Sequence, residues 1–259
     1  MTTRVSLPHS GNFPMIRNFV RAAASQSAVS ITRSTPFVGS RFFSMTSSNS
    51  GRGFKQGRGT GDSGQSSLYN SERRWKDDDT FNALGTTDEL SSYLGVCGSS
   101  AQNDGGMDDV VETLTRLQCC LQDVGAHLAT PPKSSSERKQ KKTMFDVAMV
   151  EWINAEIDRY GDDLPAIRQF ILSGGGVTSA NLQYARAICR RAERSVVPLM
   201  REENIDPMAL KFLNRMSDLL FVLGRTACMR NKFDELTYLR PDSFTNMKWD
   251  RKSLHDKKK

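Results

Sequence analysis

From about Asp77 to Arg230, apolar residues recur at steps of three and four, which is the period of an α-helix. No stretch shows the convincing alternation of apolar and polar residues that marks a half-buried strand. The expected helices span residues 77–102, 108–129, 145–160, 178–202 and 206–230. Five amphipathic helices in one chain predict an all-α fold, a five-helix up-and-down bundle with antiparallel neighbours.

Capping signals place two of the helix starts. Thr178 or Ser179 is a suitable N-cap after the loop Ser173-Gly174-Gly175-Gly176. Asp206 followed by Pro207 is a suitable start for the last helix. The link PPKSSSERKQKK at 131–142 has two prolines and a basic-polar run, so we expect an exposed, mobile loop, and the sequence assigns it no role.

The two ends of the chain differ in composition from the helical part. Residues 1–60 hold eight basic residues and no acidic one, which is typical of a mitochondrial transit peptide. We expect residues 1–50 to be a disordered transit peptide, or a basic arm that stays attached, and the mature protein to lie in the mitochondrial matrix. Residues 51–76 are then a flexible glycine-rich lead-in, 77–232 the bundle, and 233–259 a disordered, basic polar tail.

The net charge of +7 comes from the two ends. Eight of the 36 basic residues precede position 61 and six lie in the last twelve positions, which leaves 22 basic and 27 acidic residues in 61–247. A core with a net charge of −5 is a poor general partner for a phosphate backbone, so we expect no nucleic acid. An RNA-binding function for GRGFKQGRG would depend on terminal charge alone. No apolar run approaches the roughly 20 residues that span a bilayer, so no membrane is expected.

Histidine and cysteine chemistry is sparse. His9 and His255 lie in the terminal segments, which leaves His127 alone in the helical part. The five cysteines include an adjacent pair and no C-x-x-C, which argues against a disulfide framework or a cysteine-ligated zinc. Neither a zinc site nor Ser-His-Asp catalysis can be built from this set. An enzyme of this composition would depend on charge stabilisation and positioning.

Two patterns are suited to an anion. Gly59-Thr60-Gly61-Asp62-Ser63-Gly64 lacks the flanking strand and helix of a dinucleotide site, but its backbone N–H groups can approach phosphate, with Arg73, Arg74 and Lys76 as counter-charges. A plain linker is the alternative. In the fourth helix, Arg186, Arg190 and Glu193 project within about sixty degrees of one another, which suits an anion at the bundle edge, a subunit contact, or simply a solvated face. Asn214, Asp218 and Arg225 form a similar polar line on the fifth helix, unless Asp218 only pairs with an arginine of helix four.

Three blocks of sequence resemble one enzyme family. They are TGDSGQSSLYNSERRWKDD (60–78), ALGTTDELSSYLG (83–95), and the pair FILSGGGVTSANLQYARAICRRAER (170–194) with KFLNRMSDLLFVLGRTACMR (211–230). They resemble the PduO-type ATP:cob(I)alamin adenosyltransferases over roughly residues 58–230. The resemblance implies a helical bundle that forms a homotrimer, with active sites between subunits.

The implied reaction is attack of the cobalt(I) of reduced cobalamin on C5′ of ATP, which gives adenosylcobalamin and triphosphate. Cobalt(I) is already a strong nucleophile, so the missing histidines are no obstacle. The implied partners are a flavoprotein or other reductase that supplies cobalt(I) and a B12-dependent mutase that receives the product. A helical escort that delivers the cofactor without making it is the alternative from the binding class.

The resemblance also implies roles for individual residues. The phosphate site would comprise Arg58, Gly59, Thr60, Gly61, Ser66, Ser67 and Lys76, with Mg²⁺ held by the ATP phosphates and not by protein ligands. Arg190, Arg191, Ala192, Glu193, Arg194 and Asn214 of another subunit would complete the nucleotide site. Asp88 would pair with Arg186 across the interface. Phe170 would lie at the lower corrin face and Asp218 near Arg190, so the implied catalytic set is Arg186, Arg190, Asp218 and Phe170. Arg58-Gly59 and Ser173 depart from the family's usual Thr-Lys and Pro.

Overall fold

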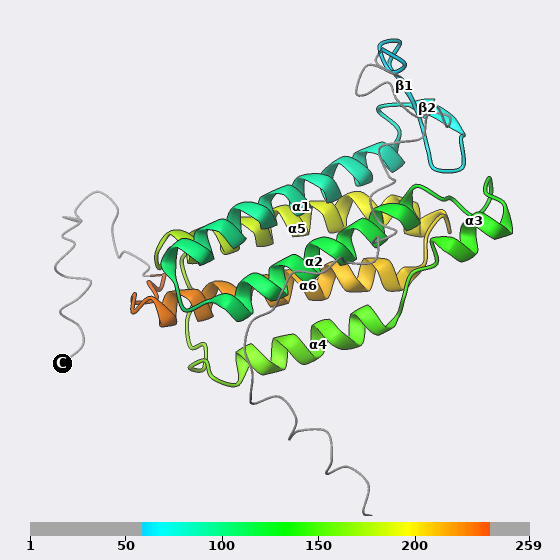
Figure 1. Ribbon diagram of the computed structural model, residues 1–259. Helices are drawn as coiled ribbons and strands as arrows, with labels where there is room; N and C mark the ends of the chain where they lie inside the picture. The colour runs from blue at the N-terminus through cyan, green and yellow to red at the C-terminus, as the bar shows by residue number, and fades with distance from the viewer. Residues whose placement is uncertain (1–58, 239–259) are drawn as a thin grey trace, which may run out of the picture. The chain divides into compact units, whose positions relative to one another are not determined.

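The computed structural model describes residues 59–238, and this part forms six α-helices and one two-stranded antiparallel sheet. The elements are β1 (Gln65–Ser67), β2 (Arg73–Trp75), α1 (Asp79–Asp104), α2 (Asp108–Leu128), α3 (Glu137–Lys142), α4 (Ala148–Gly161), α5 (Val177–Arg201) and α6 (Pro207–Arg230). Five long helices lie alongside one another (Figure 1). The predicted all-α bundle is confirmed, while the predicted disorder of residues 1–50 and of the tail beyond 238 falls outside the described residues.

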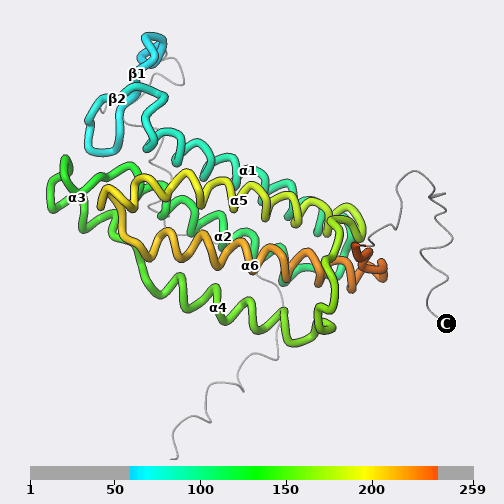
Figure 2. Tube along the Cα trace, turned by 180° about the vertical axis from the view of Figure 1, so that it is seen from behind, coloured from blue at the N-terminus to red at the C-terminus, as the bar shows by residue number. Residues whose placement is uncertain are grey.

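Antiparallel packing joins the long helices into one core. Thr86 on α1 hydrogen-bonds Ser195 on α5 at 2.7 Å between the hydroxyls, while Asn181 near the start of α5 donates to Ser100 near the end of α1 at 2.8 Å. These contacts require α1 and α5 to run in opposite directions. Seen from behind, α4 lies along α6 on the outer side of the bundle (Figure 2).

The apolar faces of α1, α2, α5 and α6 form a continuous buried core. Its largest fully buried side chains include Leu90, Leu94, Leu114, Leu117, Leu182 and Phe212. Every one of these side chains comes from a helix whose apolar spacing is visible in the sequence, which is why the period alone predicts the bundle. No helix within residues 59–238 has both the length and the apolar character needed to cross a bilayer.

Three short elements, β1, β2 and α3, are absent from the sequence prediction. β1 and β2 form a hairpin inside the expected flexible lead-in; strands of three residues are too short for alternation to be recognised. α3 occupies half of the expected mobile loop at 131–142. Its residues, ERKQKK, are all good helix formers, and Gln140 closes the loop by donating to the carbonyls of Pro132 and Ser135 at 2.9 and 2.8 Å.

The start of α5 differs from the predicted cap. The N-cap is Gly176, at φ +94°, and both Thr178 and Ser179 are buried within the first turn. Close packing against α6 explains the difference, because a Cβ on Gly175 would lie 2.9 Å from Cys228 Cβ. The predicted start of α6 is confirmed, since Asp206 accepts a hydrogen bond from the Met208 N–H at 2.8 Å.

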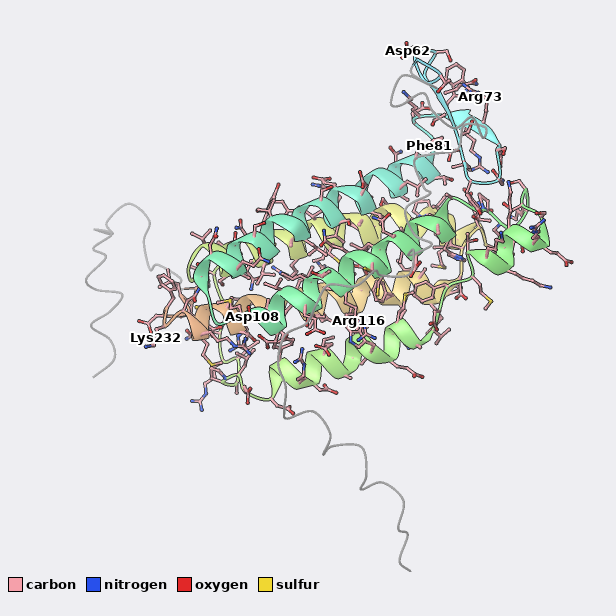
Figure 3. All side chains as sticks on the ribbon, in the orientation of Figure 1. Asp62, Arg73, Phe81, Asp108, Arg116 and Lys232 are labelled. Carbon is pink, nitrogen blue, oxygen red and sulfur yellow. The ribbon has the colours of Figure 1, made fainter. Side chains whose placement is uncertain are left out.

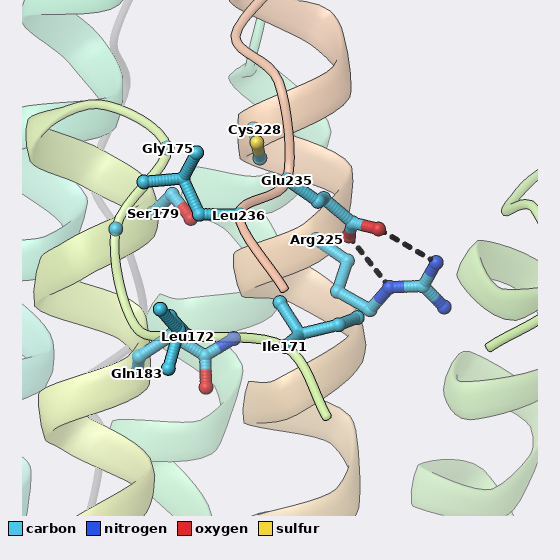
Figure 4. A pocket seen from close by; sticks show the side chains of 10 residues that line it. Ile171, Leu172, Gly175, Ser179, Gln183, Arg225, Cys228, Glu235 and Leu236 are labelled. Atoms are coloured by element: carbon cyan, nitrogen blue, oxygen red, sulfur yellow. Dashed lines mark hydrogen bonds and ion pairs between the residues drawn. The ribbon is translucent and has the colours of Figure 1, made fainter. Parts of the chain in front are cut away.

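Residues 233–238 pair with the loop before α5, although we expected them to belong to the tail. The Leu172 N–H donates to Leu236 O at 2.7 Å, and the Tyr238 N–H donates to Phe170 O at 2.8 Å. Arg225, predicted on a polar line with Asn214 and Asp218, is instead buried. Its guanidinium forms a bidentate ion pair with the Glu235 carboxylate. Both residues line a small pocket (Figure 4).

The glycines before α5 generate a stability prediction. Gly175→Ala should lower the free energy of unfolding by about 1–3 kcal/mol, because the residue has φ +82° and its Cβ would collide with Cys228. Gly98→Ala, in the middle of α1 with open space around it, should instead raise it by about 0.5–1 kcal/mol. Urea unfolding measures both, and equal effects would contradict the close packing at Gly175.

Candidate active site

The glycine segment at 59–64, which is called the lead-in from here on, forms two successive turns. The Asp62 N–H donates to Gly59 O, and the Gly64 N–H donates to Gly61 O, both at 3.1 Å. Gly59 and Gly64 have φ +87° and +81°, which favours glycine at each position. A Cβ on Gly61 would lie 3.0 Å from Lys76 Nζ, so the ammonium group lies directly against this backbone. Backbone without side chains beside a cation is suited to a phosphate chain.

The hairpin register distributes its polar side chains over two faces. Ser67 is opposite Arg73 and Ser66 is opposite Arg74. Neighbouring residues of a strand point to opposite faces, so Ser67 shares a face with Arg73, whereas Ser66 shares a face with Arg74. The Arg73 guanidinium reaches the lead-in and donates to Thr60 O at 3.3 Å. Asp62 and Arg73 lie in the part of the chain that extends past the start of α1 (Figure 3).

Arg74, on the opposite face, attaches the hairpin to the bundle. Its guanidinium forms two hydrogen bonds to the Glu72 carboxylate, at 2.8 and 3.1 Å, and also donates to Thr80 Oγ1 at 3.1 Å. The bonds from Arg74, and next the one from the Ser134 hydroxyl, lower the pKa of Glu72 to about 2. Arg74 is thus neutralised by a fixed carboxylate, whereas Arg73 and Lys76 remain beside the lead-in.

A second polar group lies between α5 and α6, and we call it the α5–α6 polar cluster: Arg190, Glu193, Asn214, Arg215 and Asp218. Glu193 accepts from Asn214 at 2.8 Å, Arg215 donates to the Asn214 side chain at 2.5 Å, and Arg215 pairs with Asp218 at 3.2 Å. The alternative in which Asp218 pairs with an arginine of the neighbouring helix is not observed, because its ion pair is made with Arg215 within α6. Arg215 is not among the residues predicted from the sequence, although its i,i+3 spacing to Asp218 indicates an ion pair.

The environment of Cys189 shows which charges converge on this cluster. Burial raises the pKa of the Cys189 thiol, the negative charge of Glu193 raises it further, Arg190 opposes this, and Asp218 adds to it. Three of the predicted residues therefore act electrostatically on one buried thiol, with the Arg190 side chain exposed to solvent. The structure brings together Arg190, Glu193, Asn214 and Asp218, from two helices that the sequence could treat only separately.

Other predicted residues of α5 have different surroundings. Arg186 donates to Gln183 at 3.2 Å and lies over the Phe221 ring at 5.6 Å, so it also faces α6. Arg191 forms an ion pair with Glu89 of α1, the residue next to the exposed Asp88.

Two neighbouring positions complete this part of α5. Ala192 is fully buried, so its side chain contributes packing only, whereas Arg194 is exposed.

Phe170 lies at the far end of the bundle from the lead-in. It precedes α5, whereas the lead-in precedes α1, and these helices are antiparallel. Since α5 has 25 residues, the separation is roughly 35 Å at 1.5 Å per residue. Phe170 is 85% exposed even though its backbone is pinned by Tyr238. One chain therefore does not bring the lead-in and Phe170 together, and Arg58 lies outside the described residues.

Comparison with known proteins identifies the family. The model of a family described as cobalamin adenosyltransferase matches residues 58–227. The chain belongs to the cobalamin adenosyltransferase family. This makes it an enzyme of the transferase class, and the matched range contains the lead-in, the hairpin and the α5–α6 polar cluster.

Named relatives agree with the family assignment. Corrinoid adenosyltransferase MMAB of Mus musculus is 46% identical over 71% of this chain and 76% of its own length, and the corrinoid adenosyltransferase of Bacillus subtilis is 36% identical over 70% and 90%. Among solved structures, a variant PduO-type ATP:corrinoid adenosyltransferase of Lactobacillus reuteri, complexed with cobalamin and ATP, is 33% identical with a TM-score of 0.63, covering 70% of this chain and 97% of that one.

The hairpin anchor generates a pH prediction. The pKa of Glu72 is lowered in the folded state, from 4.5 to about 2, so its stabilising contribution is complete above about pH 5 and is lost as the pH falls toward 2. Glu72→Gln should therefore have a lower Tm than wild type above pH 5, with the gap narrowing on acidification. Glu112→Gln, at an exposed position of α2, is the control. A gap for Glu72→Gln that is constant from pH 6 to 3 would contradict the assignment.

Proposed function

We propose that this chain transfers the 5′-deoxyadenosyl group of ATP to the cobalt(I) of reduced cobalamin by direct attack. An electron pair of cobalt(I) forms the bond to C5′, the C5′–O bond breaks, and the pair of that bond leaves with triphosphate. The product is cobalt(III) adenosylcobalamin. The observation that supports this best is the combination of glycine-rich turns beside Lys76 with an α5–α6 polar cluster that presents the exposed Arg190, in a family whose solved member is complexed with cobalamin and ATP.

The proposed task of the lead-in is to hold the triphosphate as negative charge accumulates on it. Gly59, Thr60 and Gly61 offer backbone, and Lys76 offers charge, with Arg58, Ser66 and Ser67 as further predicted contributors. Mg²⁺ is proposed to be bound by the ATP phosphates, where it would help to neutralise the leaving group.

The proposed task of the α5–α6 polar cluster is to complete the nucleotide site and position cobalt against C5′. Arg190 has the exposed guanidinium needed to contact an anion, while Glu193 and Asn214 fix each other across the two helices. Arg194 is equally exposed, and Asp218 would lie beside the corrin. Preorganised charge of this kind needs no general base, which suits a nucleophile that is already reactive.

The separation of about 35 Å between the lead-in and Phe170 supports a site shared between chains. A triphosphate bound at the lead-in could not place its adenosyl group near Phe170 of the same chain. We propose a homotrimer in which the lead-in of one subunit meets α5 and α6 of the next, with Asp88 pairing with Arg186 across the interface. Phe170 would then lie against the lower corrin face.

The proposed cellular setting follows from the chemistry and the sequence. Cobalt(I) requires a reductase, flavoprotein or other, immediately before this step. The product would be handed to a B12-dependent mutase. The N-terminal segment without Asp or Glu supports its role as a transit peptide that directs the protein to the mitochondrial matrix.

An anaerobic assay tests the reaction. Residues 51–259 are mixed with MgATP and chemically reduced cobalamin, and the loss of cobalt(I) absorbance is followed together with a light-sensitive adenosyl product. Product that requires ATP supports the proposal. A folded protein that binds cobalamin and yields no product would leave the escort function, for which ATP binding measured by equilibrium dialysis should be absent.

Arg190 is predicted to be essential for turnover. Arg190→Ala should lower kcat/KM by about 100-fold or more, because a few kcal/mol of leaving-group stabilisation would be lost. Arg201→Ala removes the same charge at an exposed position at the end of α5 and should leave the rate near wild type. Near-normal turnover of Arg190→Ala would exclude this residue from the site.

Phe170 is predicted to act on the corrin substrate without supporting the fold. Phe170→Ala should unfold within about 0.5 kcal/mol of wild type, because the ring is exposed, yet adenosylation should fall at least tenfold. Met144→Ala, at another exposed apolar position between α3 and α4, should change neither quantity. Paired urea unfolding and anaerobic assays separate the two effects, and unchanged adenosylation by Phe170→Ala would refute the role.

A further inference from the structure

We propose that residues 131–142 position the nucleotide-binding hairpin, with Ser134 and Lys139 as the positioning residues that set ATP affinity. We call this segment the strut. The inference depends on the proposed function, because it takes the lead-in to be the triphosphate site. In both views of the backbone, α3 lies at the same end of the bundle as the hairpin (Figures 1 and 2).

The first contact joins Ser134 of the strut to the turn between β1 and β2. The Ser134 hydroxyl donates to Glu72 Oε2 at 2.5 Å and accepts from Asn70 Nδ2 at 2.9 Å. The Asn70 amide also donates to Ser134 O at 3.3 Å. Glu72 is the same carboxylate that binds Arg74, so Ser134 joins the strut to the ion pair that anchors the hairpin on α1.

The second contact comes from α3. Lys139 Nζ donates to Tyr69 O at 3.0 Å and lies 5.4 Å from the centre of the Tyr69 ring. The helical turn that begins after Ser136 carries Lys139 to this point, with the Lys139 N–H donating to Ser136 O at 2.9 Å. A mobile loop, as the sequence predicts, could not hold the ammonium group in one place.

The strut is itself held by the bundle. Lys133 Nζ donates to Glu202 O, the carbonyl just beyond α5, at 2.7 Å. Gln140 donates to two carbonyls inside the strut, so the segment is closed on itself. The turn also contacts α2 directly, through the Tyr69 N–H and Ala129 O at 3.1 Å.

The hairpin connects this turn to the lead-in. The Leu68 N–H donates to Glu72 O at 2.8 Å, and the Lys76 N–H donates to Gly64 O at 2.9 Å at the other end of the ribbon. A ribbon with two three-residue strands is marginal by itself. Without the strut, ATP binding would have to order the hairpin, and that cost would appear as weaker binding.

Two variants test the inference: one removes the charge of Lys139 and the other removes the hydroxyl of Ser134. Each is compared with a conservative substitution at the same position. Lys139→Met and Ser134→Ala should raise both the Kd and the KM for ATP about fivefold, with kcat at saturating ATP and the KM for cobalamin unchanged. Lys139→Arg and Ser134→Thr retain the donors and should restore affinity. Lys141→Met, at an exposed position of the same helix, removes an equal charge and should behave as wild type.

Hydrogen exchange at the amides of residues 65–76 in the ligand-free protein gives a readout independent of catalysis. Faster exchange together with weaker ATP binding, in Lys139→Met and Ser134→Ala only, supports the strut. Unchanged exchange overturns it, and so does faster exchange with unchanged ATP affinity. Wild-type protein that binds ATP in this strut-dependent manner but forms no adenosylcobalamin would refute the proposed function and leave the strut intact.

Discussion

The packing of α5 against α6 is the contact on which the candidate site depends. Their apolar faces are buried against each other, and the Cys189 thiol donates to Leu213 O at 3.2 Å where the helices meet. This packing fixes the relative height of the two helices, so Glu193 and Asn214 come within hydrogen-bonding distance at the edge of the core. Polar side chains bordering a close-packed stripe have little freedom to reorganise, and electrostatic preorganisation requires that rigidity.

The two ends of the bundle have different means of support. At the α5 start, the loop carrying Phe170 is held by backbone pairing with residues 236–238 and by the buried Arg225–Glu235 ion pair. At the opposite end, the hairpin has few buried apolar groups, Leu68 being the clearest, and relies on hydrogen bonds to Glu72, Tyr69 and Arg74. An element with so little buried apolar surface depends for its order on these hydrogen bonds, which is why contacts outside the hairpin matter to the segment proposed to bind phosphate.

The roles of the ionisable groups agree with the proposed site, which would use fixed charge in place of acid–base chemistry. His127, the one histidine within residues 59–238, bridges Thr143 O and the Asp206 N–H, at 2.9 and 2.8 Å, and thereby joins the end of α2 to the start of α6. Both ring nitrogens of His127 are thus engaged in hydrogen bonds that support the fold. The group available to bind an anion between α5 and α6 is the exposed Arg190, while Glu193 and Asp218 pair with Asn214 and Arg215.

The sequence by itself determined the bundle, the start of α6 at Asp206 and the family, because apolar period, proline position and local motifs are properties of consecutive residues. Only the tertiary structure decided how separate segments meet. In the structure the N-cap of α5 is Gly176, and Arg225 is buried and paired with Glu235. Residues 131–142 contact the hairpin and support it. Each of these depends on a partner between 10 and 70 residues away in the chain, which no local pattern encodes. The distance between the lead-in and Phe170 is likewise set by helix direction, so only the fold reveals that these two segments of one chain lie far apart.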